Sequence, residues 1–179
     1  MDKSLLTLIT FLPLAGAVVM LLAPNGRPGP IRVIAAITTG IVFALTLYLW
    51  WIFDAAAIEA GGALAAYDAR TLVEIPWIKA YNIYYRLGVD GLSVMLIVLT
   101  GLLSFLATFS AFSVVKQVKA FYVLYMLLVT GMMGVFMALD FFLFYVFWEV
   151  MLLPMYFLIG IWGGPRKEYA AIKFFIYTL

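Results

Sequence analysis

A single carboxylate, Glu149, stands in the middle of a long apolar stretch of this sequence. The stretch runs from Asp140 to Gly164 and reads DFFLFYVFWEVMLLPMYFLIGIWGG. An ionisable side chain at that depth in a lipid-embedded segment is energetically expensive, and acids found there usually serve ion or proton pathways. Glu149 is therefore the first candidate for proton-relay chemistry.

Two tyrosines and a proline accompany Glu149 at helical spacing. Tyr145 and Tyr156 fall on the helix face of Glu149, where their phenols can hydrogen-bond the carboxyl group or link it to water. Pro154 removes the amide that would bond the Val150 carbonyl. We expect a kink there, at which water or a cation can be held. The alternative is a structural glutamate, paired with a base on another helix or kept protonated in a hydrogen bond.

Lys173 is the basic residue that falls inside an expected membrane span. It lies about 8 Å from the near end of its helix, whereas Glu149 lies about 20 Å deep, so we expect no direct salt bridge between them. Tyr169 and Tyr177 lie four residues to either side of Lys173 and extend its face. Two roles stay open for Lys173, a water-bridged relay and a side chain that snorkels to the membrane surface.

The composition is that of a membrane protein. Hydrophobic residues make up 67% of the 179 residues and charged residues only 11%, outside the usual range of soluble domains. Cysteine and histidine are both absent, so thiolate and imidazole ligands for iron–sulfur clusters, haem or zinc are excluded in this chain. We expect no metal, cofactor or redox centre here. The net charge is only +2 and the basic residues are scattered, so the sequence shows no basic patch for binding nucleic acid.

Hydropathy predicts an all-α, polytopic bundle forming one membrane domain over residues 1–179. An apolar run of about 20 residues is long enough to cross a bilayer. A sixth helix of 12 residues reaches only about 18 Å, so we expect a fragment or a truncated product. Three prolines and two glycines in residues 24–30 predict no helix there. The expected spans are 4–23, 31–53, 89–112, 120–139 and 141–162, with the incomplete one at 168–179.

The long connection over residues 54–88 carries two short runs rich in aromatic and β-branched residues, TLVEIPWI and YNIYYRLG. This pattern predicts a short extracytoplasmic β-hairpin.

Three further predictions concern the helices. Asp90 is expected to cap the helix that follows this connection, and Asp140 is expected to form a tight turn. Gly131 and Gly134 lie on one helix face and should let a neighbouring helix approach closely.

The basic residues indicate the orientation of the chain. They cluster in the short connections after the first, third and fifth spans, and such connections normally face the cytoplasm. We therefore expect a multi-pass membrane protein with its N terminus on the extracytoplasmic side; the resemblance described below implies the bacterial cytoplasmic (inner) membrane. The residues concerned are Arg27, Arg32, Lys116, Lys119, Arg166 and Lys167.

Three segments closely resemble a known family, subunit M of the proton-pumping NADH:quinone oxidoreductase, respiratory complex I, the counterpart of mitochondrial subunit 4. They are GVDGLSVMLIVLTGLLSFLATFS (88–110), GVFMALDFFLFYVFWEVMLLPMYFLIGIWGG (134–164) and YAAIKFFIYT (169–178). By this resemblance the chain is the N-terminal part of such a subunit, and Glu149 matches the family's essential membrane glutamate. The family's lysine partner would lie beyond Leu179. Lys173 matches the KFF motif, for which no catalytic role is carried over.

The resemblance implies a proton-translocating subunit of an oxidoreductase whose chemistry occurs elsewhere. NADH, FMN, iron–sulfur clusters and quinone would belong to other subunits, and the partners would be other membrane-arm subunits, including the antiporter-like subunits L and N, and the lipid bilayer. Alternatives are a subunit of a multisubunit sodium/proton antiporter or of a membrane-bound hydrogenase. A structural membrane subunit without its own proton path is a third alternative.

Overall fold

The computed structural model describes residues 4–24, 28–53 and 72–179. In these ranges five helices are long and apolar enough to cross a membrane, and a shorter sixth follows. The predicted class, an all-α bundle of membrane spans, is confirmed. The helices are α1 (Leu5–Leu22), α2 (Pro28–Ile52), α3 (Gly91–Ser110), α4 (Val118–Met137), α5 (Phe141–Trp162) and α6 (Lys167–Thr178).

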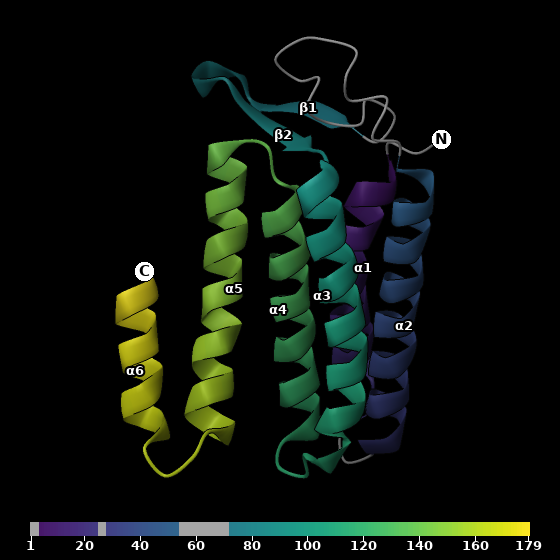
Figure 1. The fold of residues 1–179 in the computed structure, drawn as a ribbon. Helices are drawn as coiled ribbons and strands as arrows, with labels where there is room; N and C mark the ends of the chain where they lie inside the picture. The colour runs from purple at the N-terminus through teal and green to yellow at the C-terminus, as the bar shows by residue number, and fades with distance from the viewer. Residues whose placement is uncertain (1–3, 25–27, 54–71) are drawn as a thin grey trace.

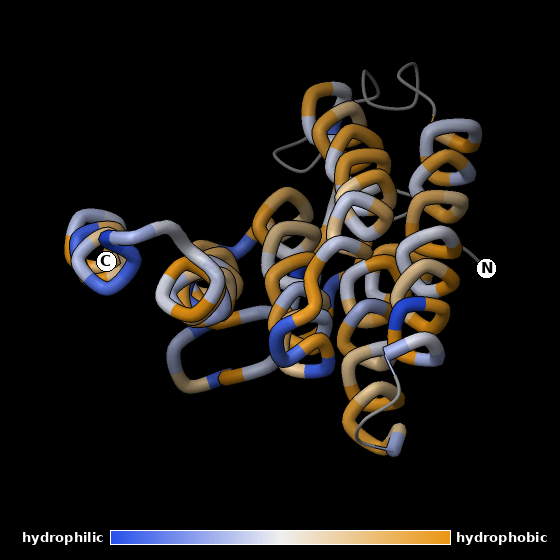
Figure 2. Tube along the Cα trace, turned by 90° about the horizontal axis from the view of Figure 1, so that it is seen from below, coloured by the Kyte–Doolittle hydropathy of each residue, from blue (hydrophilic) through white to orange (hydrophobic). Residues whose placement is uncertain are grey.

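The five long helices stand side by side, and α6 lies at one edge next to α5 (Figure 1). Helix α4 packs against both α1 and α5, and α2 packs against α3. The view along the bundle shows α6 separated from the other helices by α5 (Figure 2). Apolar side chains from α1 to α5 form the core, and among them Leu6, Ile9, Leu49, Ile97 and Met133 are fully buried.

The start of α2 differs from the prediction for residues 24–30. Helix α2 begins at Pro28 and includes Gly29 and Pro30, so the prediction that no helix forms there is wrong for these three residues. The amides of the first helical turn have no partner within the helix, and proline loses nothing at such positions. Pro28 and Pro30 therefore lie in the first turn of α2 and do not prevent the helix from forming.

The predicted hairpin is confirmed and lies across one end of the bundle (Figure 1). Strand β1 (Val73–Ile78) pairs antiparallel with β2 (Ile83–Leu87). Between them a short 3₁₀ turn (Lys79–Tyr81) ends at Asn82, whose φ of 54° lies in the left-handed region that asparagine tolerates. The earlier part of the predicted loop, residues 54–71, lies outside the described residues.

Side-chain contacts tie the hairpin to itself and to α1. Arg86 forms an ion pair with Glu74 across the two strands. The Tyr85 hydroxyl donates a hydrogen bond of 3.2 Å to the Thr7 hydroxyl on α1. Burial raises the pKa of the Tyr85 phenol above its ordinary value, with the Thr7 hydrogen bond acting in the opposite direction. The hairpin is therefore anchored to the helices through a half-buried, neutral phenol.

Helices α4 and α5 approach closely because glycine faces α5 at two positions. A Cβ added to Gly131 would lie 2.9 Å from the Met151 Cβ and 3.0 Å from its backbone nitrogen, and one added to Gly134 would overlap the Phe147 ring. The expected close approach at Gly131 and Gly134 is confirmed. Without larger side chains between them, the backbones gain dispersion contacts that hold helices together in lipid.

A leucine at Gly131 should weaken the bundle. The atoms in its way belong to the Met151 backbone and cannot move aside alone, so we expect Gly131→Leu to lower the free energy of unfolding by about 1–3 kcal/mol. Titration of the full-length protein in detergent with sodium dodecyl sulfate measures this. Gly91→Leu is the matched control, because Gly91 has open space around it. Equal unfolding midpoints for the two variants would contradict the packing argument.

Candidate functional site

Helix α5 places Glu149 near its middle, as the sequence predicts. The helix runs unbroken from Phe141 to Trp162 with Pro154 inside it. Asp140 caps its start by accepting hydrogen bonds from the amides of Phe142 (2.9 Å) and Leu143 (3.3 Å). Glu149 is thus held more than two turns from the helix start, in a segment apolar enough to span a membrane. The predicted kink at Pro154 stays a prediction.

The Glu149 carboxyl group is incompletely satisfied. Its side chain is half-buried and lies near the Tyr145 phenol, which is one turn earlier on the same helix face. Its Oε1 atom is buried and has no hydrogen-bond partner within the described part of the chain. Buried polar atoms nearly always have partners, so an orphaned one marks a place where water, a proton or a further group is accommodated.

Tyr156 lies two turns beyond Glu149 and takes part in a different contact. Its ring packs against Phe175 of α6, with ring centroids 5.7 Å apart, and against Phe157 of its own helix at 5.4 Å. Of the two predicted phenol partners, the structure therefore brings Tyr145 to Glu149, whereas Tyr156 belongs to the α5–α6 interface. That interface also includes Ala171 of α6, whose Cβ faces Gly160.

Lys173 does not meet Glu149. Its side chain is exposed, and its ammonium lies 5.8 Å from the ring centre of Tyr169 and 5.7 Å from that of Tyr177. Both rings belong to its own helix, and such cation–π contacts stabilise an ammonium outside water. Within the described ranges, no ion pair or hydrogen bond joins Lys173 to Glu149.

Asp140 does more than form the predicted turn. Its Oδ1 atom caps α5, and its Oδ2 atom accepts a hydrogen bond of 3.2 Å from the Tyr84 amide of β2. The adjoining backbone completes this junction, because the Leu139 amide donates to the Arg86 carbonyl at 3.0 Å. One carboxylate thus connects the hairpin to the helix that carries Glu149. Sequence reasoning missed this role, since Tyr84 is 56 residues away.

Asp90 has the predicted role. It begins α3 in a reciprocal capping box, in which its carboxylate accepts from the Ser93 amide at 2.6 Å and the Ser93 hydroxyl accepts from the Asp90 amide at 2.9 Å. Both polar groups are satisfied by each other. Asp90 is therefore a structural residue at the start of a membrane span.

A buried cluster of hydroxyl groups between α2, α3 and α4 was not predicted. The Thr39 and Thr108 hydroxyls lie 3.2 Å apart. The phenols of Tyr122 and Tyr125 donate to the carbonyls of Thr108 (3.2 Å) and Ser104 (2.6 Å). Helical spacing of Ser104 with Thr108, and of Tyr122 with Tyr125, is the signal that could have revealed it. Because each hydroxyl bonds helix backbone or a neighbouring hydroxyl, the cluster serves to join helices.

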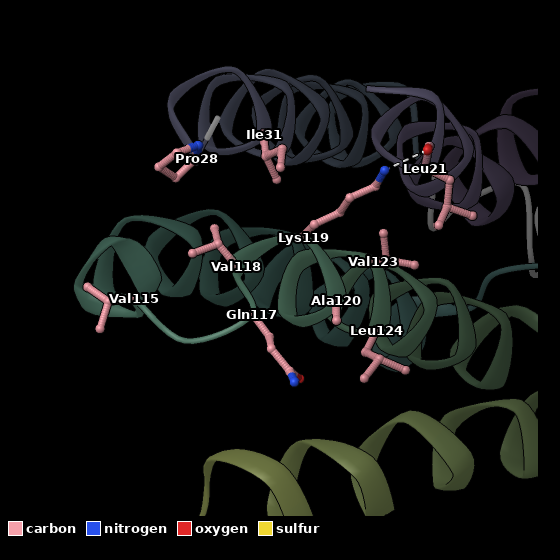
Figure 3. A pocket seen from close by; sticks show the side chains of 10 residues that line it. All are labelled: Leu21, Pro28, Ile31, Val115, Gln117, Val118, Lys119, Ala120, Val123 and Leu124. Carbon is pink, nitrogen blue, oxygen red and sulfur yellow. Dashed lines mark hydrogen bonds between the residues drawn. The ribbon is translucent and has the colours of Figure 1, made fainter. Parts of the chain in front are cut away.

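Basic side chains at the other end of the bundle bind backbone carbonyls. Lys119 reaches from α4 to the last turn of α1 (Figure 3), where its ammonium donates to the carbonyls of Leu21 (2.7 Å) and Ala23 (2.9 Å). Lys167 donates to the Ile161 carbonyl at the end of α5, at 3.0 Å. Cations suit the negative ends of helix dipoles. Lys119 also lines an open groove of about 780 Å³, whose other described lining residues carry no charge.

Comparison with known proteins gives the class to which this fold and site belong. Residues 138–179 match the model of a family described as NADH:quinone oxidoreductase/Mrp antiporter, TM. These residues include Glu149 and all of α6. This part of the chain, with Glu149, is therefore similar to that family of membrane proteins.

Within the family, the chain is similar to proteins named NADH-quinone oxidoreductase subunit M. It is 40% identical to that of Escherichia coli K12 over 82% of this chain and 30% of the relative. It is 39% identical to that of Rhodobacter capsulatus over 98% of this chain and 33% of the relative. The chain thus spans about a third of the length of the curated relatives that it matches.

Solved structures share the fold. A chain of respiratory complex I from Thermus thermophilus with bound NADH superposes with a TM-score of 0.75 at 26% identity, over 96% of this chain and 32% of that chain. A chain of an archaeal membrane-bound sulfane sulfur reductase has a TM-score of 0.68 at 20% identity, over 96% of this chain and 33% of that chain. The second likeness concerns the fold alone.

Removing the Asp140 carboxylate should destabilise the junction of α5 with the hairpin. Asp140→Ala leaves the amides of Phe142, Leu143 and Tyr84 without their acceptor, and loss of a helix cap alone costs about 0.5–2 kcal/mol. Asp140→Asn keeps an acceptor oxygen and should retain most of the stability. Unfolding midpoints of the full-length protein in detergent measure both effects. An alanine variant as stable as the asparagine variant would show that the cap contributes nothing.

Proposed function

We propose that the chain is part of a proton-translocating membrane subunit of an NADH:quinone oxidoreductase, with Glu149 as a proton-relay acid. The observation that carries the proposal is the Glu149 Oε1 atom, which is buried near the middle of an apolar span and has no hydrogen-bond partner among the described residues. Such a group is costly in a purely structural role. A role in proton transfer explains why a carboxyl group occupies that position.

The rest of the complex supplies the redox chemistry in this proposal. NADH oxidation and quinone reduction, with FMN and iron–sulfur clusters, take place in other subunits, and the membrane-arm subunits, including L and N, are the neighbours of this chain. The similarity to subunit M proteins supports this assignment. This chain's own residues hold and pass the proton, with Tyr145 orienting the Glu149 carboxyl group.

A positive charge that approaches and leaves Glu149 would drive the relay. A nearby ammonium favours the ionised carboxylate, and its withdrawal in a low-dielectric site favours proton uptake. Lys173 is poorly placed for this task, because its ammonium lies between Tyr169 and Tyr177. We propose that the moving charge comes from another segment, with Lys173 contributing at most through water.

The proposed location is a bacterial cytoplasmic membrane, with the hairpin and N terminus on the outer side. The ends of α1, α3 and α5 lie together at the end of the bundle opposite the hairpin (Figure 1). Basic side chains gather there, including Arg32, Lys119 and Lys167. Positive residues near span ends favour the cytoplasmic side.

A cation/proton antiporter subunit is the second candidate, because the matching family description names the Mrp antiporter beside the oxidoreductase. The oxidoreductase and the antiporter differ in the energy source that drives proton movement. Proton movement that requires NADH supports the oxidoreductase. Sodium-dependent proton movement driven by an imposed gradient, without NADH, supports the antiporter.

Replacing Glu149 with glutamine tests the relay directly. Glu149→Gln keeps the size of the side chain but cannot titrate, so we expect proton pumping by the assembled complex in vesicles to fall about 10²-fold. NADH oxidation by an artificial acceptor that bypasses the membrane arm should be unchanged. Glu168→Gln, at the start of α6, is the matched control. Normal pumping by the Glu149→Gln complex would refute the relay role.

A further inference from the structure

A second polar site lies where α5 ends and α6 begins, and neither Glu149 nor Tyr145 lines it. A cavity of about 690 Å³ opens there, between the last turn of α5 and one flank of α6. Three cationic side chains line it: Arg166, Lys167 and Lys173. The acid of this region, Glu168, lines a different cavity on the opposite flank of α6. The described residues thus form a pocket with positive charge and no neutralising carboxylate.

The cations follow one face of α6. Arg166 and Lys173 are seven residues apart, which is two helical turns, so they lie one above the other. Tyr169 lies between them, and its ring and that of Tyr177 flank the Lys173 ammonium. Both charged side chains are exposed. The arrangement presents two cations to an occupant outside the helix pair.

Other features of the pocket favour an anion with an apolar part. Arg166 provides no side-chain cap for α6, so amides of the first turn add to the positive field. Lys167 uses one donor on the Ile161 carbonyl and keeps others for a ligand. The remaining wall includes Ile159 and Phe174, which are apolar. Phosphate oxygens next to a hydrocarbon chain match this combination.

We propose that this pocket binds the headgroup of an anionic phospholipid, with the phosphate between Arg166 and Lys173 and an acyl chain against Ile159 and Phe174. The depth of the pocket in the membrane fits a lipid headgroup, because the pocket lies where membrane spans end. Tyrosines, such as Tyr169 here, are enriched at the level of the headgroups. Basic pockets between membrane helices suit anionic lipids. The binding would hold α6 against α5 at the end opposite the hairpin.

Site-specific photocrosslinking tests the proposal in the full-length protein within its assembled complex. Benzoylphenylalanine replaces Tyr169 in the pocket or, as a control, Ile172, which is exposed on the opposite flank of α6. The complex is reconstituted in phosphatidylcholine vesicles with a minor fraction of phosphatidylglycerol. Lipid crosslinked from position 169 should be enriched in phosphatidylglycerol over its share of the bilayer, and lipid from position 172 should not.

Charge variants identify the cause of the enrichment. Arg166→Gln and Lys173→Gln should each lower it about fivefold, the effect of about 1 kcal/mol per cation, whereas Lys173→Arg should retain it. Arg166→Gln changes an exposed residue, so it keeps the test valid if a Lys173 variant fails to assemble. Labelling of the two lipids from position 169 in proportion to their shares of the bilayer would overturn the proposal. So would a crosslink to a polypeptide, which would assign the pocket to an acidic protein segment.

Discussion

The bilayer interior offers no hydrogen-bond partner to a polar group, and this constraint explains most of the structure. The chain crosses as helices because only helices satisfy their own backbone within one segment. Helix ends, which have unpaired carbonyls, receive the ammonium groups of Lys119 and Lys167. Buried hydroxyls such as Thr39 and Thr108 bond one another or the backbone. Within the described residues the Glu149 carboxyl group departs from this pattern, since its Oε1 atom is buried without a hydrogen-bond partner, as are the Nε atoms of Arg32 and Arg86.

The depth and orientation of that carboxylate are set by two contacts at a distance from it. Gly131 and Gly134 bring α4 and α5 close together on the level of Met151 and Phe147. Asp140 fixes the start of α5 to the hairpin. Because a helix is stiff, fixing its start and one face also fixes a residue in its middle. The hairpin therefore contributes to the geometry of the site although it lies at the end of the bundle.

Local patterns were the part of the structure that the sequence could predict. The length of the apolar runs predicts the spans, and two short runs rich in aromatic and β-branched residues predict the hairpin. The four-residue spacing of Tyr145 and Glu149 puts them on one helix face. What depended on tertiary contact was missed, as with the Tyr84–Asp140 bond. The start of α2 at Pro28 was missed for a local reason, because proline was treated as a helix breaker where it is tolerated.

The relay role proposed for Glu149 requires its carboxyl group to exchange a proton during turnover. Infrared difference spectroscopy of the assembled complex, started by adding NADH, reports this directly through the carbonyl stretch of a protonated carboxylic acid. We expect a carboxylic-acid band that changes on turnover in the wild-type complex and is missing from the Glu149→Gln complex. Identical difference spectra from the two complexes in that region would contradict it.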